Sequence, residues 1–295
     1  MEFENFKWSL LEAVRGKLGE GMLARLNKIE KNNGFSYDGI TIFKKESSLS
    51  PVIAVGPYYE RYQGGGSLED MAEEILEKYE EAIADRRMPF RSYPDYASVR
   101  ESLFFRVINK EKNKLLLENV PSLTRLDLAL VAYYSVDIGG EDDTVVMVRN
   151  EDIRRWKIEE NVVLQKAVQN TARRDEVRLS SLSEMMKAML PEEEEIPDPG
   201  LYVLSNEQAS YGAGLIFLPG VPARISDVFR TDLMIIPSSV HEVLICPMAD
   251  LSHAGRFGAL VREVNQTQVP PQDILSDHVY GYFRESGTLK ILDQE

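Results

Sequence analysis

The chain has 295 residues and a mass of 33.5 kDa, enough for one large domain or two smaller ones with a well-buried core. Its 43% hydrophobic and 28% charged residues exclude a disordered chain. A net charge of -14 creates a field that repels phosphate backbones, so we expect no binding to nucleic acid.

The number of cysteines and the length of the apolar runs indicate where in the cell the protein is expected. Cys246 is the only cysteine, which excludes an intramolecular disulfide and fits a reducing environment. No apolar run approaches the roughly 18 residues needed to cross a bilayer. The opening MEFENFKWSL lacks the basic region and apolar run of a signal peptide. We therefore predict a cytoplasmic protein that makes no membrane contact.

The first 85 residues predict two helices and three strands. Apolar residues recur at spacings of three and four from Phe3 to Leu18, which is the period of an amphipathic helix. The turn sequence Asn32-Asn33-Gly34 separates two strand-like runs and predicts a hairpin. Ser67 and Asp70 form the capping-box pattern of a second helix that ends near Asp85. The expected strands are 22–30, 36–45 and 51–55.

The middle of the chain alternates strand-like and helix-like runs. Branched and aromatic residues predict strands at 103–109, 127–138 and 144–150. Asn150 is expected to cap a turn, and a helix follows at 159–171. Ser181 is expected to open a methionine-rich helix over 182–190.

Residues 191–200 read as a linker. The segment holds three prolines, which exclude a helix, and four consecutive glutamates, which repel one another and stay solvated. This composition predicts an N-terminal α+β lobe over 1–190 and a C-terminal α+β lobe over 201–295.

The last hundred residues predict strands interleaved with helices. Strands are expected at 201–206, 212–219, 232–237 and 241–247, with a closing hairpin over 279–284 and 288–292. Helices are expected from Pro222 and over 251–264. The predicted fold class is α+β, with two lobes that each hold a small mixed or antiparallel sheet packed with helices.

Known catalytic and metal-binding patterns are absent from the sequence. Gly64-Gly65-Gly66 lacks the Lys-Ser/Thr of a phosphate loop, and Ser238-Ser239 lacks the Gly-x-Ser-x-Gly elbow. His241 and Glu242 are neighbours, and the three histidines and Cys246 show no short ligand spacing. We expect no metal, no cofactor and a Cys246 that is structural, because it ends an apolar strand without a cation to activate it.

The best candidate site lies within residues 232–282, where polar groups follow strand ends. The turn at 237–241 and the segment 265–277 are expected to meet there. Its candidate ligand or partner residues are Ser238, Ser239, His241, Gln268 and Asp277. His241 is the natural proton carrier because imidazole titrates near neutrality. The competing interpretation is that these groups cap one another and form no cavity.

Four segments carry a resemblance to a known family: WKIEENVVLQKAVQNT, YVLSN, PSSVHEVLICP and VNQTQVPPQDILSDHVYGY. In this order they resemble a bacterial family of uncharacterised proteins, a domain of unknown function from Gram-positive gut bacteria. The similarity spans nearly the whole chain. The part from Asp127 to Thr171 is also similar to a second uncharacterised bacterial family. Neither resemblance implies an activity, a cofactor or a catalytic residue.

These observations predict a non-catalytic binding or regulatory protein of bacterial type, with an unidentified protein or small molecule as partner. No residue is assigned a catalytic role. The alternative is a hydrolase with a site assembled across the lobes around His241, Asp277 and Glu242, which would leave no local motif.

Overall fold

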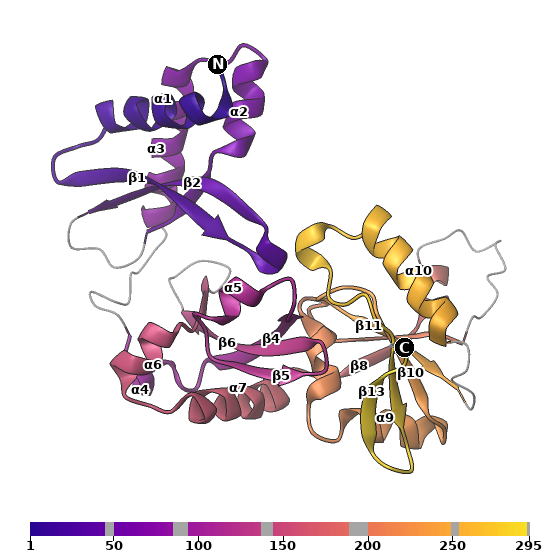
Figure 1. The fold of residues 1–295 in the computed structure, drawn as a ribbon. Helices are drawn as coiled ribbons and strands as arrows, with labels where there is room; N and C mark the ends of the chain where they lie inside the picture. Colours follow the sequence, from indigo (N-terminus) through magenta and orange to yellow (C-terminus); the bar gives the residue numbers. More distant parts are fainter. Residues whose placement is uncertain (45–49, 85–93, 137–143, 189–199, 249–253, 294–295) are drawn as a thin grey trace. The chain divides into compact units, whose positions relative to one another are not determined.

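The computed structural model describes residues 1–44, 50–84, 94–136, 144–188, 200–248 and 254–293 (Figure 1). The described elements form an α+β fold with three small antiparallel sheets, which confirms the predicted fold class. The chain divides into two compact units. The first comprises Met1–Val99 and Ser135–Val146, and the second comprises Arg100–Tyr134 and Met147–Glu295.

The first unit packs helices against a three-stranded sheet of order β1-β2-β3 (Figure 1). Its strands are β1 (Met22–Glu30), β2 (Ser36–Lys44) and β3 (Val52–Ala54). Its helices are α1 (Phe3–Gly16), α2 (Gly56–Gln63), α3 (Leu68–Ala84) and α4 (Tyr96–Val99). Side chains from α1, the sheet and α3 share one core, including fully buried Phe6, Leu10, Ile40, Ile42, Met71 and Ile75. The predicted opening helix, the hairpin and the third strand are confirmed.

The hairpin turn has the backbone that its sequence predicts. Residues Asn32–Gly34 form a short 3-10 turn, η1, in which Asn33 and Gly34 have φ angles of 59° and 71°. Asparagine and glycine tolerate this left-handed region better than other residues do. At the start of α3, Asp70 N donates to Ser67 Oγ at 3.4 Å, so Ser67 caps that helix as expected.

The second unit begins with a four-stranded sheet in which β6 lies between β4 and β5 and also pairs with β7. The strands of this sheet are β4 (Leu103–Asn109), β5 (Ser122–Arg125), β6 (Leu128–Val136) and β7 (Thr144–Met147); the end of β6 and most of β7 fall within the Ser135–Val146 part of the first unit. The accompanying helices are α5 (Lys114–Leu117), α6 (Asn150–Trp156) and α7 (Glu160–Arg174). Helix α7 lies along β4 (Figure 1), where Thr171 Oγ1 accepts a bond from Phe105 N at 3.2 Å. Asn150 begins α6 but does not cap it, because the N-cap is Arg149, whose amide donates to Asp152 Oδ2 at 2.8 Å.

A six-stranded antiparallel sheet completes the second unit, in the order β13-β12-β10-β11-β9-β8. Its strands are β8 (Arg178–Ser181), β9 (Tyr202–Ser205), β10 (Leu233–Pro237), β11 (Val243–Pro247), β12 (Tyr280–Phe283) and β13 (Thr288–Ile291). The connecting helices are α8 (Leu182–Lys187), α9 (Val221–Phe229), α10 (Ala254–Thr267) and the 3-10 turns η2 (Gly212–Phe217) and η3 (Pro271–Asp273). Val261 of α10 packs with Met234 on one face, and Phe229 of α9 contacts Tyr202 on the other.

The six-stranded sheet contains strands from both sides of the predicted linker. Strand β8 precedes residues 191–200 and β9 follows them, and the two pair in antiparallel register from Arg178 opposite Ser205 to Ser181 opposite Tyr202. Residues 191–199 lie outside the described residues. The boundary between lobes at 191–200 therefore stays a prediction.

The strand predicted at 212–219 is wrong, because these residues form the 3-10 turn η2. Leu215 and Ile216 are buried, which explains why this run of residues is apolar. The chain is held in a turn by close approach: Gly212 N donates to His241 O at 2.9 Å, and Gly212 lies against Ser205. A short apolar run fits a buried turn and a buried strand equally well, so its composition could not distinguish them.

We expect Gly212→Ala to destabilise the protein by about 1–3 kcal/mol. A Cβ at this position would stand 2.6 Å from Asn206 N and 2.9 Å from Ser205 Cα, and the backbone would have to shift. Urea unfolding measures the loss. The matched control is Gly255→Ala in α10, where a Cβ meets nothing within 4 Å and a gain of up to ~1 kcal/mol is expected. Equal stability of the two variants would contradict the close approach.

Candidate functional site

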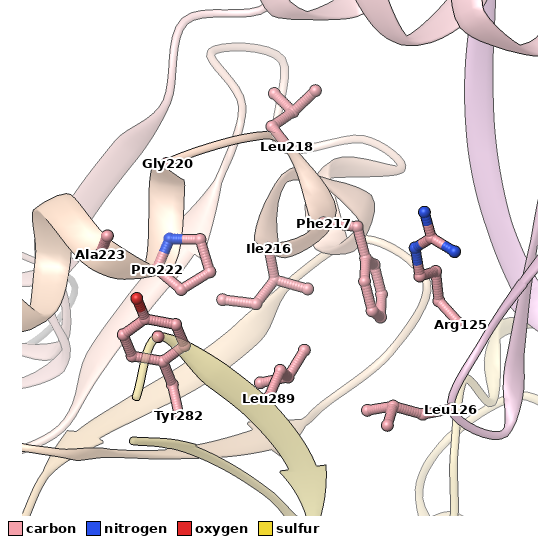
Figure 2. A pocket seen from close by; sticks show the side chains of 11 residues that line it. Arg125, Leu126, Ile216, Phe217, Leu218, Gly220, Pro222, Ala223, Tyr282 and Leu289 are labelled. Carbon is pink, nitrogen blue, oxygen red and sulfur yellow. The ribbon is translucent and has the colours of Figure 1, made fainter. Parts of the chain in front are cut away.

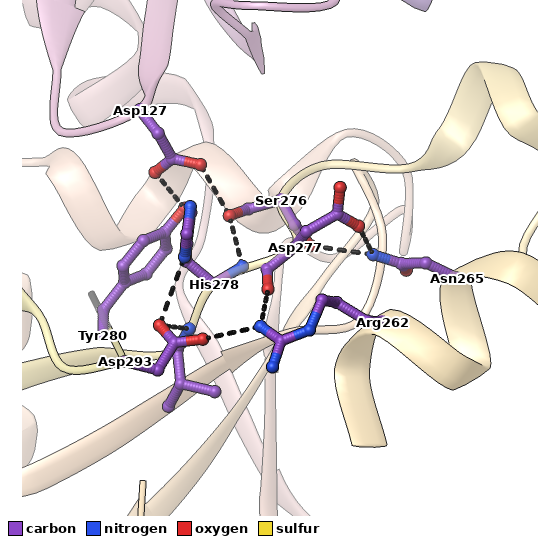
Figure 3. A network of polar contacts seen from close by, with 9 residues as sticks. Asp127, Arg262, Asn265, Ser276, Asp277, His278, Tyr280 and Asp293 are labelled. Atoms are coloured by element: carbon purple, nitrogen blue, oxygen red, sulfur yellow. Dashed lines mark hydrogen bonds and ion pairs between the residues drawn. The ribbon is translucent and has the colours of Figure 1, made fainter. Parts of the chain in front are cut away.

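A partly buried network of polar groups centres on Asp127, in the turn between β5 and β6 (Figure 3). Tyr280 Oη donates to Asp127 Oδ1 at 2.8 Å, and Ser276 Oγ donates to Asp127 Oδ2 at 2.6 Å. Burial raises the pKa of Tyr280 well above its usual value, and the adjacent Asp127 charge raises it further. Tyr280 is fully buried and therefore stays a hydrogen-bond donor at physiological pH.

The turn that carries Asp127 has an unusual backbone. Arg125 pairs with Leu128, so Leu126 and Asp127 alone connect the strands. Leu126 has a φ angle of 55°, in a region that costs an L-residue about 1–2 kcal/mol. The two bonds accepted by Asp127, with that from Lys110 N to its carbonyl at 2.9 Å, hold the turn in this conformation.

Asp293 forms the second centre of the network (Figure 3). Its side chain is 2% exposed and accepts a bond from Val279 N at 3.0 Å. Arg262 Nη1 lies 3.2 Å from Asp293 Oδ2, and His278 Nδ1 lies 3.3 Å from Asp293 Oδ1. The network thus satisfies its own charges, which favours a structural role for it.

A pocket of about 300 Å³ lies where the β5–β6 turn, the η2–α9 connection and the β12–β13 hairpin meet (Figure 2). Its walls are mostly apolar, and Arg125 and Tyr282 lie on opposite sides of it. It is lined by Arg125, Leu126, Ile216, Phe217, Leu218, Gly220, Pro222, Ala223, Tyr282, Gly287 and Leu289. Among the described residues, Arg125 has no ion-pair partner, and its guanidinium donates to Thr124 O at 3.1 Å.

His241 lies in the turn between β10 and β11, next to an aromatic ring and a carboxylate. Its Nδ1 accepts a bond from Tyr211 N at 3.2 Å, and the two rings are 5.1 Å apart. Because Nδ1 is the acceptor, the neutral ring carries its proton on Nε2, which lies 3.7 Å from Asp273 Oδ1. His241 N also donates to Ser239 Oγ at 3.0 Å.

The turn at 237–241 contacts η3, because Val240 N donates to Asp273 O at 2.8 Å. Asp277 is bound elsewhere: Lys112 Nζ lies 3.3 Å from its Oδ2, and Asn265 Nδ2 donates to its Oδ1 at 2.8 Å. The carboxylate beside His241 is therefore Asp273. Of the remaining candidates, Ser238 and Glu242 are half-buried and Gln268 is exposed. In the described part of the chain, no three His, Cys, Asp or Glu side chains are grouped to hold a metal ion.

Sequence reasoning missed Asp127, Tyr280 and Asp293 as site-forming residues. The sequence predicts a strand that begins at Asp127, and a carboxylate at the start of an apolar run indicates that it has a specific partner. Its partners Ser276 and Tyr280 are 149 and 153 positions away in the sequence, so no local spacing could identify them.

Comparison with protein-family models identifies the family. The model of DUF5688, a family of unknown function, matches residues 3–284. The chain belongs to this family. The match spans nearly the whole chain and confirms that the sequence resembles an uncharacterised family, while the bacterial range stays a prediction. No curated protein and no solved structure matches this DUF5688 protein. Within its described residues, no helix has the length and apolar character needed to cross a membrane.

We expect Tyr280→Phe to destabilise the protein by about 1–3 kcal/mol, because Asp127 Oδ1 loses the hydrogen bond that the buried Tyr280 hydroxyl donates. The pair should be coupled, so that Tyr280→Phe costs less when Asp127 is already alanine. Urea unfolding of the two single variants and the double variant measures this coupling. Tyr282→Phe is the control, since its hydroxyl has no hydrogen-bond partner among the described residues. Additive effects of the Tyr280 and Asp127 changes would show that the bond contributes nothing.

Cys246 should react slowly with thiol reagents at neutral pH. It lies half-buried on β11 opposite Met234, and burial raises the pKa of its thiol, so little thiolate forms. Labelling of native and urea-unfolded protein with a disulfide reagent compares the rates. Cys246→Ala should leave the circular dichroism spectrum unchanged. Equal labelling rates in the two states would contradict this assignment.

Proposed function

We propose that this DUF5688 protein is a cytoplasmic, non-catalytic binding protein of bacterial type that takes a small, largely apolar molecule with one anionic group. The observation that carries the proposal is the pocket of Figure 2, whose apolar walls have at one side the guanidinium of Arg125, which forms no ion pair with any described residue. Pockets for small molecules are concave and mostly apolar, with a few polar groups that set orientation.

The chemistry of the lining favours an amphipathic ligand. Ile216, Pro222 and Leu289 offer apolar surface, and each Å² of apolar ligand surface removed from water contributes about 25 cal/mol. Arg125 is exposed and can form paired hydrogen bonds with a carboxylate at the pocket edge. A volume of about 300 Å³ is at the lower end of ligand pockets and suits a short chain or a single ring.

The pocket has walls that are fixed before any ligand arrives. Leu126 is held by the hydrogen bonds of Asp127, and Ile216 belongs to η2, which is anchored through Gly212 to His241 O. A preformed site loses little conformational entropy when it binds, which favours affinity. The nearby carboxylates of Asp127 and Asp293 are already bonded to protein donors, and this supports holding a ligand over transforming one.

One observation favours the alternative of a hydrolase. His241 lies 3.7 Å from Asp273, as a general base oriented by a carboxylate would. The hydroxyl of Ser239, however, accepts a bond from the His241 amide, and it forms no hydrogen bond with the imidazole ring among the described residues. Hydrolysis of p-nitrophenyl acetate by the wild type, lost in His241→Asn, would support this alternative over the binding proposal.

The binding proposal is tested by calorimetric titration with octanoate. We expect a saturable heat for the wild type and none for Ala223→Trp, because Ala223 lines the pocket and an indole would fill it. Val228→Trp is the matched control: it adds the same ring to the same helix at a position that is 73% exposed and outside the lining. No binding by the wild type, or equal binding by both variants, would contradict the proposal.

The role of Arg125 is tested by comparing octanoate with uncharged octanol. Arg125→Gln should weaken octanoate binding by about threefold to fivefold, as expected for an exposed ion pair worth up to ~1 kcal/mol. Octanol binding should not change, because it makes no ion pair. Arg224→Gln, on α9 and outside the lining, is the control. An equal loss for both ligands would show that Arg125 acts through the shape of the pocket.

A further inference from the structure

Arg106 of β4 is enclosed by aromatic rings. Its guanidinium carbon lies 3.5 Å from the centroid of Tyr211, 5.0 Å from that of Tyr133 and 5.5 Å from that of Phe104. Phe104 and Tyr133 are buried cross-strand neighbours whose rings stack 5.9 Å apart. The side chain is therefore fixed in direction by packing on three rings.

The charge of Arg106 has no acidic partner among the described residues. No hydrogen bond or ion pair in that part of the chain involves its side chain, and its Nε is a buried nitrogen without an acceptor. Burial lowers the pKa of Arg106, and the neighbouring Arg174 charge lowers it further. A buried donor without an acceptor destabilises the folded state, and more so when it is charged.

Two other arginines of the second unit have carboxylate partners that Arg106 lacks. Arg174 also lies over Phe104, at 4.4 Å, but its Nε is 2.9 Å from Asp175 Oδ1. Arg262 pairs with Asp293. Attraction to ring faces compensates part of a positive charge but supplies no hydrogen-bond acceptor for the planar fork of a guanidinium. The N–H groups of Arg106 are therefore available to donate to an acceptor on a ligand.

Tyr211 covers the guanidinium from a surface turn. The residue is 37% exposed and has a φ angle of 54°, outside the usual range for a tyrosine. The turn is held by Asn206, whose side chain donates to Ser210 O at 2.8 Å and accepts from Ser210 N at 3.0 Å. Tyr211 N is bound by His241 Nδ1. Strained backbone of this kind persists only where surrounding contacts hold it, and it concentrates at binding sites.

We propose that Arg106 anchors a second binding site, separate from the pocket of Figure 2, for a ligand that carries one oxyanion group, a carboxylate or a phosphate. A guanidinium presents two parallel donors that match the oxygens of either group. The bound oxyanion supplies the missing counter-charge, and Tyr211 forms the exposed aromatic wall beside it. In a protein of charge -14, the positive charges of Arg106 and the neighbouring Arg174 attract a small anion to this place.

The test uses NMR of arginine side chains in the full-length protein, with sodium acetate and sodium phosphate as probes. Each is titrated at constant ionic strength against sodium chloride. We expect a saturable shift of the Arg106 Nε–Hε signal and of the Tyr211 amide. The tighter of the two probes identifies the oxyanion as carboxylate or phosphate. Absence of a saturable shift with both probes overturns the proposal.

Three variants separate binding from packing. Arg106→Gln should abolish the shift of the Tyr211 amide, and Arg106→Lys should weaken it by about tenfold, because an ammonium lacks the planar fork. Arg25→Gln is the control: Arg25 also lies over a ring, Phe43 at 5.1 Å, but is exposed. The proposal is overturned if Arg25→Gln abolishes the anion-induced shift of the Tyr211 amide. It is also overturned if Arg106→Lys and Arg106→Gln bind acetate and phosphate as tightly as the wild type does. If Arg106→Gln does not fold, Arg106→Lys decides. Ala223→Trp should leave the acetate and phosphate responses unchanged, which separates this site from the octanoate pocket.

Discussion

The carboxylate of Asp127 is the interaction on which the second unit depends. One oxygen accepts the Tyr280 hydroxyl and the other accepts the Ser276 hydroxyl, so residues 149 and 153 positions apart become neighbours. A fully buried phenol requires an acceptor, because the loss of its water is otherwise uncompensated. The same contact joins the four-stranded sheet, which carries Asp127, to the six-stranded sheet, which carries Tyr280.

That contact also determines the shape of the pocket. Leu126 precedes Asp127 in a two-residue turn and takes up a left-handed conformation that an isolated hairpin would avoid. The hydrogen bonds of Asp127 offset this cost and place Leu126 in the pocket wall. The half-buried carboxylate of Asp127 thus stabilises a strained turn, and that turn forms part of the wall of a preformed pocket.

The polar groups of the second unit fall into two classes with different consequences. Asp127, Asp293 and Asn265 are bonded to donors or acceptors within the chain and contribute to its stability. Arg125 and Arg106 have no acidic partner among the described residues, and both lie beside apolar or aromatic surface. These two arginines are the groups that we propose to recognise a ligand, because each lies beside apolar or aromatic surface. This is why the two proposed sites share a preference for anions while differing in size and lining.

The sequence by itself determined the regular elements whose signal is local. Helix α1, the β1–β2 hairpin, helix α7 and strands β4 and β6 follow from apolar spacing and turn residues, because backbone geometry repeats over a few residues. It also indicated that the turn at 237–241 approaches the segment 265–277, while the ligand role of Ser238, Ser239, His241, Gln268 and Asp277 stays a prediction. Only the tertiary structure decided that residues 212–217 form a turn, that His241 lies beside Asp273, and that Asp127 binds Tyr280. Those outcomes depend on packing between segments that are distant in the sequence. This packing, and not the local sequence, determines which groups a polar side chain contacts.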